Sequence, residues 1–234
     1  MVYIQQLALD LGFEHNLHTF ETFILGENAE IVSILKKLFS KPLSKSPSRM
    51  IYIWGEAESG KTHLLHSINA KAKQKNDLAV YLTNKNKLID FTFLHKPCLY
   101  CIDDIHLMDE NQQIAVFNLI NEIRNEPKSA IITTGNLAPK NLVMREDVRT
   151  RMGWGLVYQV KELNNYNKKL AMINNAKSRG INLDIEIADW LLNNSYTDMN
   201  SLIDVLNALD IYSLQEKKPI SLFMLKRMLK EWAA

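Results

Sequence analysis

The sequence predicts an α/β fold in which a parallel β-sheet flanked by helices is followed by a small all-helical domain. Three observations support this prediction. Five apolar runs of strand length alternate with helical stretches, a glycine-rich motif separates the first run from the next helix, and strand-like runs stop after Val160. Alternating strands and helices are typical of a parallel sheet covered by helices. A chain of 234 residues can hold one large domain or a medium and a small one.

The composition excludes several classes of protein. Hydrophobic residues make up 47% and charged residues 23% of the chain, as in soluble globular proteins. No apolar run is long enough to span a membrane, and no segment has the pattern of a signal peptide, so we expect a cytoplasmic protein without a membrane partner. The formal net charge of +2 gives no global sign of nucleic-acid binding, and we expect no direct sequence-specific DNA binding.

The first element is an apolar tag near the N-terminus, within a tail that we place at residues 1–18. Gln6 precedes Leu7, Leu9 and Leu11, which stand at alternate positions. Terminal segments are usually polar. Such a tag either packs on the chain's own core, or is an extended peptide that a partner binds. The residues alone leave both alternatives open.

Five strand-length apolar runs come next, after an exposed loop rich in Ser, Pro and Lys at Ser40–Arg49. The runs are Met50–Trp54, Leu78–Leu82, Cys98–Asp103, Ser129–Gly135 and Gly155–Val160. They are nearly continuous rather than alternating, which predicts strands covered on both faces. Cys98 and Cys101 stand three apart in one run and point to opposite faces, so we expect buried thiols rather than a redox or metal pair.

The motif after the first run predicts a phosphate-binding loop. Residues 55–62, GEAESGKT, fit G-x-x-x-x-G-K-[ST] between a buried strand and an amphipathic helix. Its glycines let the backbone wrap round a phosphate, and amides at the helix N-terminus face the anion. Lys61 would reach the β- and γ-phosphates, and the Thr62 hydroxyl would bind Mg²⁺. We assign the nucleotide to Gly55, Ser59, Gly60, Lys61, Thr62 and His63.

An acidic pair ends the third apolar run. Asp103 would hold Mg²⁺ through water, together with Thr62. Asp104 stands where many such ATPases have the glutamate that orients the attacking water, and the shorter aspartate predicts slow hydrolysis. The alternative is that both are surface acids in a turn.

The end of the fourth run carries the polar residues Thr134 and Asn136. If the strand order is the usual one, they lie on the γ-phosphate side, where Asn136 would sense or position the attacking water. Asn after Gly also simply makes turns, and that alternative stays open.

A charged segment, Arg145–Gly155, precedes the last strand. A cationic side chain in such a place can reach the phosphate of a neighbouring molecule. The alternative is a solvated helix end, since exposed charge is the norm.

Past Val160 the pattern is helical. Apolar residues three and four apart predict helices at residues 164–180, 184–194, 198–215 and 221–233. Gly180 is a plausible C-terminal cap, and Ser221 a plausible N-terminal cap of the last helix. We therefore expect an all-helical piece after the α/β core.

These motifs resemble those of the AAA+ ATPases, and among them the DnaA-related proteins. The resemblance is carried by GKTHLLHSI, CIDDIHLM, ITTGN and DVRTRMGWG with their spacing, and it covers nearly the whole chain. It implies an AAA+ P-loop NTPase core at residues 19–160 and an α-helical lid domain at residues 161–234. DnaA-related chains normally end in a DNA-binding domain. This chain stops at Ala234 after the helical part, which resembles the Hda-type regulators.

The resemblance gives the tag a partner and Arg151 a role. It implies that the tag residues Gln6 to Leu11 bind the sliding clamp, the β subunit of DNA polymerase III. It implies that Arg151, not Arg149, is an arginine finger that acts across a subunit boundary. In the lid, Asn200 stands where the family has an arginine that contacts the nucleotide, so activity of the chain's own ATPase site is in doubt.

The favoured interpretation is an adaptor that binds ADP or ATP with Mg²⁺, binds the clamp and promotes hydrolysis of ATP held by DnaA, which limits replication initiation. Its own ATPase activity is then weak or absent, and a homodimer stays open. The alternative is a self-contained AAA+ ATPase that loads a helicase or remodels replication factors. A DNA-binding initiator module is disfavoured by the modest charge.

Overall fold

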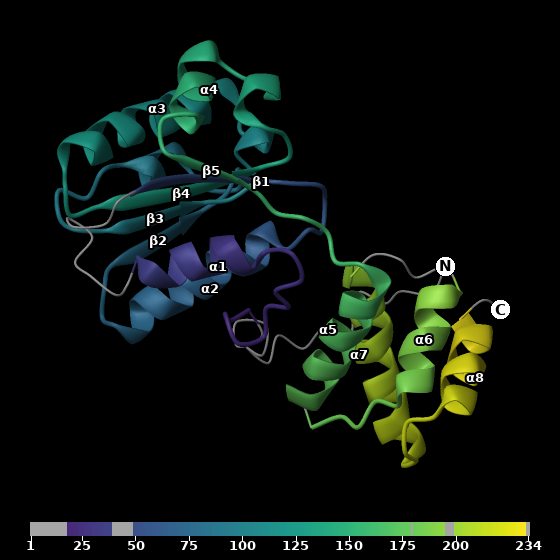
Figure 1. The fold of residues 1–234 in the computed structure, drawn as a ribbon. Coiled ribbons are helices and arrows are strands. Elements are labelled where there is room, and N and C mark those ends of the chain that lie inside the picture. The colour runs from purple at the N-terminus through teal and green to yellow at the C-terminus, as the bar shows by residue number, and fades with distance from the viewer. Residues whose placement is uncertain (1–17, 39–48, 179, 195–198, 233–234) are drawn as a thin grey trace.

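The structure is a computed structural model that describes residues 18–38, 49–178, 180–194 and 199–232. Figure 1 shows an α/β part and, beside it, a group of helices joined to it by the chain that leaves β5. The elements of the α/β part are α1 (Ala29–Lys37), β1 (Met50–Trp54), α2 (Lys61–Gln74), β2 (Ala79–Leu82), β3 (Leu99–Ile102), α3 (Glu110–Asn125), β4 (Ala130–Gly135), α4 (Glu146–Met152) and β5 (Leu156–Gln159), with short 3-10 helices at Leu88–Phe91, Ile105–Leu107 and Pro139–Asn141.

The strands form a parallel sheet in the order β2-β3-β4-β1-β5. β3 and β4 are buried throughout and β1 is buried except at its two ends, whereas β2 is mostly half-buried and β5 alternates between half-buried and exposed residues. The prediction of strands covered on both faces is confirmed for β1, β3 and β4. It is wrong for β2 and β5, because these edge strands each have a neighbour on one side only.

Helices cover the two faces of the sheet. α1 and α2 lie on one side and α3 and α4 on the other (Figure 1). Each side has its own hydrophobic core, with Leu64 and Ile68 of α2 in the first and Leu119 and Ile123 of α3 in the second. The sheet therefore separates two hydrophobic cores, one under α1 and α2 and one under α3 and α4.

The two cysteines belong to different cores. Cys101 packs on the α1 and α2 side and Cys98 on the α3 side. Both are buried free thiols, and burial raises the pKa of Cys98 to about 11. The prediction that the thiols point to opposite faces is confirmed.

The remaining helices share a third hydrophobic core. They are α5 (Asn165–Ser178), α6 (Ile185–Asn193), α7 (Met199–Glu216) and α8 (Leu222–Trp232). Each predicted helical segment is confirmed. The Ser221 hydroxyl accepts a hydrogen bond from the Met224 amide at 3.3 Å and so caps α8. Gly180 follows α5 with a left-handed φ of +77°.

A buried asparagine ties the start of α1 to the chain that leaves β5. The Asn28 side chain donates to the Lys161 carbonyl and accepts from the Lys161 amide, both at 2.8 Å. Lys161 also forms an ion pair with Glu27 at 2.7 Å. These contacts fix the chain at the point where it enters the helical part.

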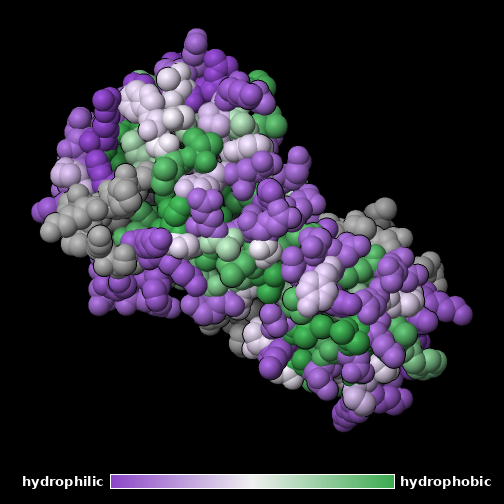
Figure 2. Space-filling view, in the orientation of Figure 1, coloured by the Kyte–Doolittle hydropathy of each residue, from purple (hydrophilic) through white to green (hydrophobic). Residues whose placement is uncertain are grey.

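The surface is mixed. Hydrophilic side chains cover most of the face shown in Figure 2, with apolar groups between them on both parts. Among the helices of the described ranges, none is long and apolar enough to cross a membrane.

Candidate nucleotide-binding site

The loop between β1 and α2 is built round two glycines. Gly60 has φ +99°, and a Cβ there would lie 2.9 Å from the Phe23 ring. A Cβ on Gly55 would lie 2.4 Å from the Val160 carbonyl oxygen. Only a glycine fits at either position without displacing a neighbour. The loop therefore lies close to the backbone of Val160 and leads directly into the N-terminus of α2.

Lys61, the first residue of α2, turns back into this loop. Its Nζ donates to the carbonyls of Gly55 at 3.0 Å and Glu56 at 2.6 Å. Burial lowers the pKa of Lys61, while the carboxylates of Asp104 and Asp103 work in the opposite direction. The ammonium group is thus buried in a loop whose other side-chain donor, the Ser59 hydroxyl, is also buried.

The Ser59 hydroxyl has no hydrogen-bond partner in the described part of the chain. A buried polar atom without a partner is costly. A phosphate oxygen would satisfy this hydroxyl and the Lys61 ammonium together. The residues at the loop therefore fit a nucleotide phosphate, by the chemistry of their donors.

Asp103 collects three hydroxyl groups. Its carboxylate accepts from Thr62 at 2.8 Å, from Tyr81 at 2.6 Å and from Thr134. The carboxylate is buried, and these hydrogen bonds compensate its lost hydration. Thr62 and Asp103, the predicted metal pair, therefore meet, and a hydroxyl beside a carboxylate is an oxygen donor set of the kind that Mg²⁺ prefers. Among the described residues no cluster of three or more His, Cys, Asp and Glu side chains could hold a metal.

Tyr81 is a further residue of the site, which the motifs of the sequence do not indicate. Tyr81 lies in β2, and its hydroxyl reaches across to the acid at the end of β3. The sequence signal for this residue is a tyrosine one residue before the end of an apolar run, on the strand that pairs with β3. The apolar run alone does not show which strand it pairs with, so the contact with Asp103 could not be predicted.

Asp104 follows in an unusual backbone conformation. Its φ is +48°, and its amide donates to the Thr134 hydroxyl at 2.8 Å. Burial, and then the negative charge of Asp103, raise the pKa of the Asp104 carboxyl. Thr134 thus joins both acids, and Asp104 lies at the same end of the sheet as Asp103.

Asn136 is exposed, one residue beyond the end of β4. β3 and β4 are parallel, with Ile102 opposite Thr133, so Asn136 follows its strand at the edge where Asp103 follows β3. Among the described residues the structure records no contact between Asn136 and either acid. Its assignment as a water-positioning residue stays a prediction.

The His63 side chain contacts the segment that precedes α1. Its Nε2 donates to the Thr19 carbonyl at 2.9 Å, and its ring contacts the rings of His18 and Phe23 at 4.8 and 5.3 Å. Burial lowers the pKa of His63 to about 4. The side chain therefore fastens the N-terminal segment to α2, and its assignment to the nucleotide stays a prediction.

Arg151 lies apart from these groups. It is in α4, which covers the opposite face of the sheet from α2 (Figure 1). Its Nε donates to the Asn121 side chain at 3.2 Å, and its guanidinium lies 3.5 Å from the centre of the Trp154 ring. The structure does not bring Arg151 to Lys61 or Asp103. The tag residues Gln6, Leu7, Leu9 and Leu11 fall outside the described residues.

Two protein families match the sequence. A model of the bacterial DnaA ATPase domain matches residues 15–159, which is more than half of the chain. A model of the lid domain of Hda matches residues 165–229. The first match covers the α/β part and the second covers most of α5–α8.

Solved structures of DnaA and RuvB have similar folds. Domain III of the Thermotoga maritima replication initiation protein DnaA gives a TM-score of 0.78 at 22% identity, covering 92% of this chain and 96% of that one. AMPPCP-bound DnaA from Aquifex aeolicus gives 0.68 at 21% identity, covering 85% and 67%. The Thermotoga maritima RuvB Holliday junction branch migration motor gives 0.61 at 15% identity, covering 85% and 68%. The predicted fold class, an AAA+ core with a helical lid, is confirmed.

Proposed function

We infer the function from one premise: this chain belongs to the family of the bacterial DnaA ATPase domain, within the AAA+ proteins, and carries a lid of the Hda type. We propose that it is a regulatory adaptor. It binds an adenine nucleotide, holds the sliding clamp through its N-terminal tag, and presents Arg151 to ATP bound by DnaA. Stimulated hydrolysis then limits replication initiation.

The nucleotide is ADP or ATP with Mg²⁺. Lys61, Ser59 and the amides at the start of α2 would hold its phosphates, and Thr62 and Asp103 would hold the metal. AMPPCP in a DnaA structure supports adenine as the base. Bound Mg²⁺ neutralises charge on the phosphates.

The position of Arg151 carries the proposal. Within one chain, Arg151 lies on the α3 and α4 side of the sheet, whereas the phosphate loop leads into α2 on the other side (Figure 1). An arginine supplied by a second molecule can stabilise the charge that develops during phosphoryl transfer. Arg151 fits that role on a partner's nucleotide better than on its own.

The second candidate is a self-contained ATPase. It is favoured by Asp104, which stands at the phosphate end of the sheet and shares Thr134 with Asp103. Against it stands Asn200, in the first turn of α7, where the family has a charged contact to the nucleotide.

Turnover measurements separate the two candidates. ATP hydrolysis is measured for this protein alone, for the protein with DnaA, and for both with clamp-loaded DNA. The adaptor predicts a large rate only when all components are present. Substantial turnover by the protein alone would overturn the adaptor and favour the ATPase.

A further inference from the structure

Arg151 is held by contacts that leave its two terminal nitrogens unused. Its Nε donates to Asn121 at 3.2 Å, and its guanidinium lies 3.5 Å from the centre of the Trp154 ring and 4.8 Å from that of Phe117. Within the described residues, neither Nη atom forms a hydrogen bond or an ion pair. The group is thus held through its Nε atom and by two aromatic rings, and its Nη atoms keep their donors.

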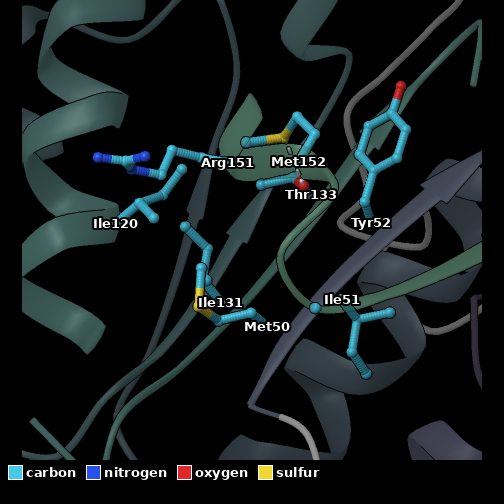
Figure 3. A pocket seen from close by; sticks show the side chains of 9 residues that line it. Met50, Ile51, Tyr52, Ile120, Ile131, Thr133, Arg151 and Met152 are labelled. Carbon is cyan, nitrogen blue, oxygen red and sulfur yellow. Dashed lines mark hydrogen bonds between the residues drawn. The ribbon is translucent and has the colours of Figure 1, made fainter. Parts of the chain in front are cut away.

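The backbone under Arg151 is also fixed. Met152, the last residue of α4, is buried, and the Thr133 hydroxyl donates to its sulfur at 3.3 Å. Figure 3 shows this contact beside a small apolar pocket, with the Arg151 guanidinium pointing away from it toward α3. The direction of the side chain is therefore set both at its base and at its tip.

An arginine held in this way suits a phosphate. The guanidinium is a planar fork, and its Nη atoms can donate two parallel hydrogen bonds to phosphate oxygens. An asparagine oxygen on Nε and an aromatic face under the plane restrict rotation without using those donors. Arg124 lies 4.7 Å from the same Trp154 ring, which adds a second positive charge to this surface.

We propose that Asn121 and Trp154 are positioning residues for Arg151, which they hold with its Nη edge available to the phosphate of a partner-bound nucleotide. The proposal rests on the proposed function, because it takes Arg151 as the group that acts on the partner. Neither residue contacts that nucleotide itself. Their effect is on the orientation of the guanidinium and hence on the rate of the stimulated reaction.

The functional test uses the full-length protein with DnaA and clamp-loaded DNA. Asn121→Ala and Trp154→Leu should each lower the maximal stimulated rate of ATP hydrolysis about tenfold or more, because misplacing a group in the transition state lowers rates steeply. The concentration of this protein at half-maximal stimulation should stay within about twofold, since ground-state binding is not changed. Trp154→Phe keeps an aromatic face and should retain most of the wild-type rate.

Asn118→Ala is the matched control, since Asn118 is an exposed asparagine on the same helix. It should behave as the wild type. Unchanged maximal rates in Asn121→Ala and Trp154→Leu would overturn the proposal. So would a Trp154→Phe variant as impaired as Trp154→Leu, because the role would then be packing rather than stacking.

A second measurement needs no partner. In the NMR spectrum of the isolated protein, the Nε proton of Arg151 should be shifted upfield by the Trp154 ring, and the shift should vanish in Trp154→Leu. An unshifted signal in the wild type would overturn the proposal even if Arg151→Ala abolishes stimulation. Full stimulation by Arg151→Ala with the ring shift present would instead overturn the proposed function, leaving the held arginine without that role.

Discussion

Asp103 shows how the site depends on single side chains. Its buried carboxylate accepts hydroxyl groups from Thr62, Tyr81 and Thr134, which belong to three different elements. A buried charge is costly unless such hydrogen bonds compensate it. The same contacts aim Asp103 at Thr62, so the hydroxyls that stabilise the acid also set the geometry of the metal pair.

Replacing Lys61 tests the nucleotide site. Lys61→Ala removes the ammonium group that faces the loop, and nucleotide affinity should fall at least about tenfold, or about 1.4 kcal/mol. Titration with a fluorescent adenine nucleotide measures this. Lys71→Ala, on the last turn of the same helix, should leave the affinity unchanged. Equal affinity in the Lys61 variant and the wild type would rule out a phosphate at this loop.

The lowered pKa of His63 predicts that the stability of the fold depends on pH. In the folded protein, burial lowers the pKa of His63 from an ordinary 6.5 to about 4. At a pH between these two pKa values, His63 therefore takes up a proton when the protein unfolds. The free energy of unfolding should fall as pH drops from 6.5 toward 4, by up to about 3 kcal/mol, and be fully restored above 6.5.

The matched variant for this prediction is His63→Gln. Glutamine can still donate to the Thr19 carbonyl but does not titrate. Urea denaturation at several pH values should show a smaller loss of stability on acidification in the variant. His18 and His66 lie against the same ring or one another and remain in both proteins, so only the difference is compared. Parallel pH profiles would contradict the assignment.

Single residues were predictable where a motif fixes their chemistry. Thr62 and Asp103 meet, and Lys61 turns into the loop beside them, because a glycine-rich loop and the end of a buried strand lie at one edge of a parallel sheet. Asn121 and the direction of His63 were not predictable. Both depend on which helix or segment packs alongside, and that is tertiary information.

At the scale of elements, local signals fixed some boundaries well. α3 begins at Glu110 because Asp109 and Gln112 cap each other's amides, and this pair is a start signal that the sequence itself contains. The edge strands β2 and β5 were predicted as fully covered. Their apolar runs resemble those of the central strands, and the number of neighbours of a strand is a property of the whole sheet.

Arg49 should stabilise the end of α3. Its Nη1 donates to the carbonyls of Ile123, Glu126 and Ser129 at 3.1, 2.6 and 2.9 Å. Arg49→Ala leaves these acceptors without a charged donor, and the free energy of unfolding should fall by about 2 kcal/mol. Thermal or chemical denaturation measures the change, with the exposed Lys128→Ala as control. A loss no greater than in the control would show that water replaces the guanidinium fully.

At the scale of the whole molecule, the phosphate loop and Arg151 are associated with opposite faces of the sheet. The phosphate loop leads into α2 on one side of the sheet, and Arg151 stands on the other side with α3 and α4. The order of strands and helices in the sequence predicted an α/β core with a helical lid. It did not predict on which face of the sheet the loop and the arginine lie. The face that a helix covers depends on how the chain crosses from one strand to the next.

The N-terminal tag should act as a clamp ligand. Replacing Leu7 and Leu9 with Ala should leave thermal stability nearly unchanged and abolish clamp binding, since truncating an anchor in a pocket commonly costs about 2 kcal/mol or more. A melting curve and a clamp-binding assay on the same variant decide this. If the tag packs on its own core, the variant should lose several kcal/mol of stability, as core Leu→Ala changes do, and keep its clamp affinity.

The most direct test of the central claim is single-turnover hydrolysis of labelled ATP already bound to DnaA. This protein is added with clamp-loaded DNA, as wild type, Arg151→Ala or the neighbouring Arg149→Ala, each first shown to bind nucleotide and clamp normally. If Arg151 acts on the partner's nucleotide, the Arg151 variant should lose the stimulation, by about a thousandfold or more as for an arginine supplied in trans, and the Arg149 variant should keep it. Hydrolysis by DnaA at the wild-type rate with Arg151→Ala would contradict the account.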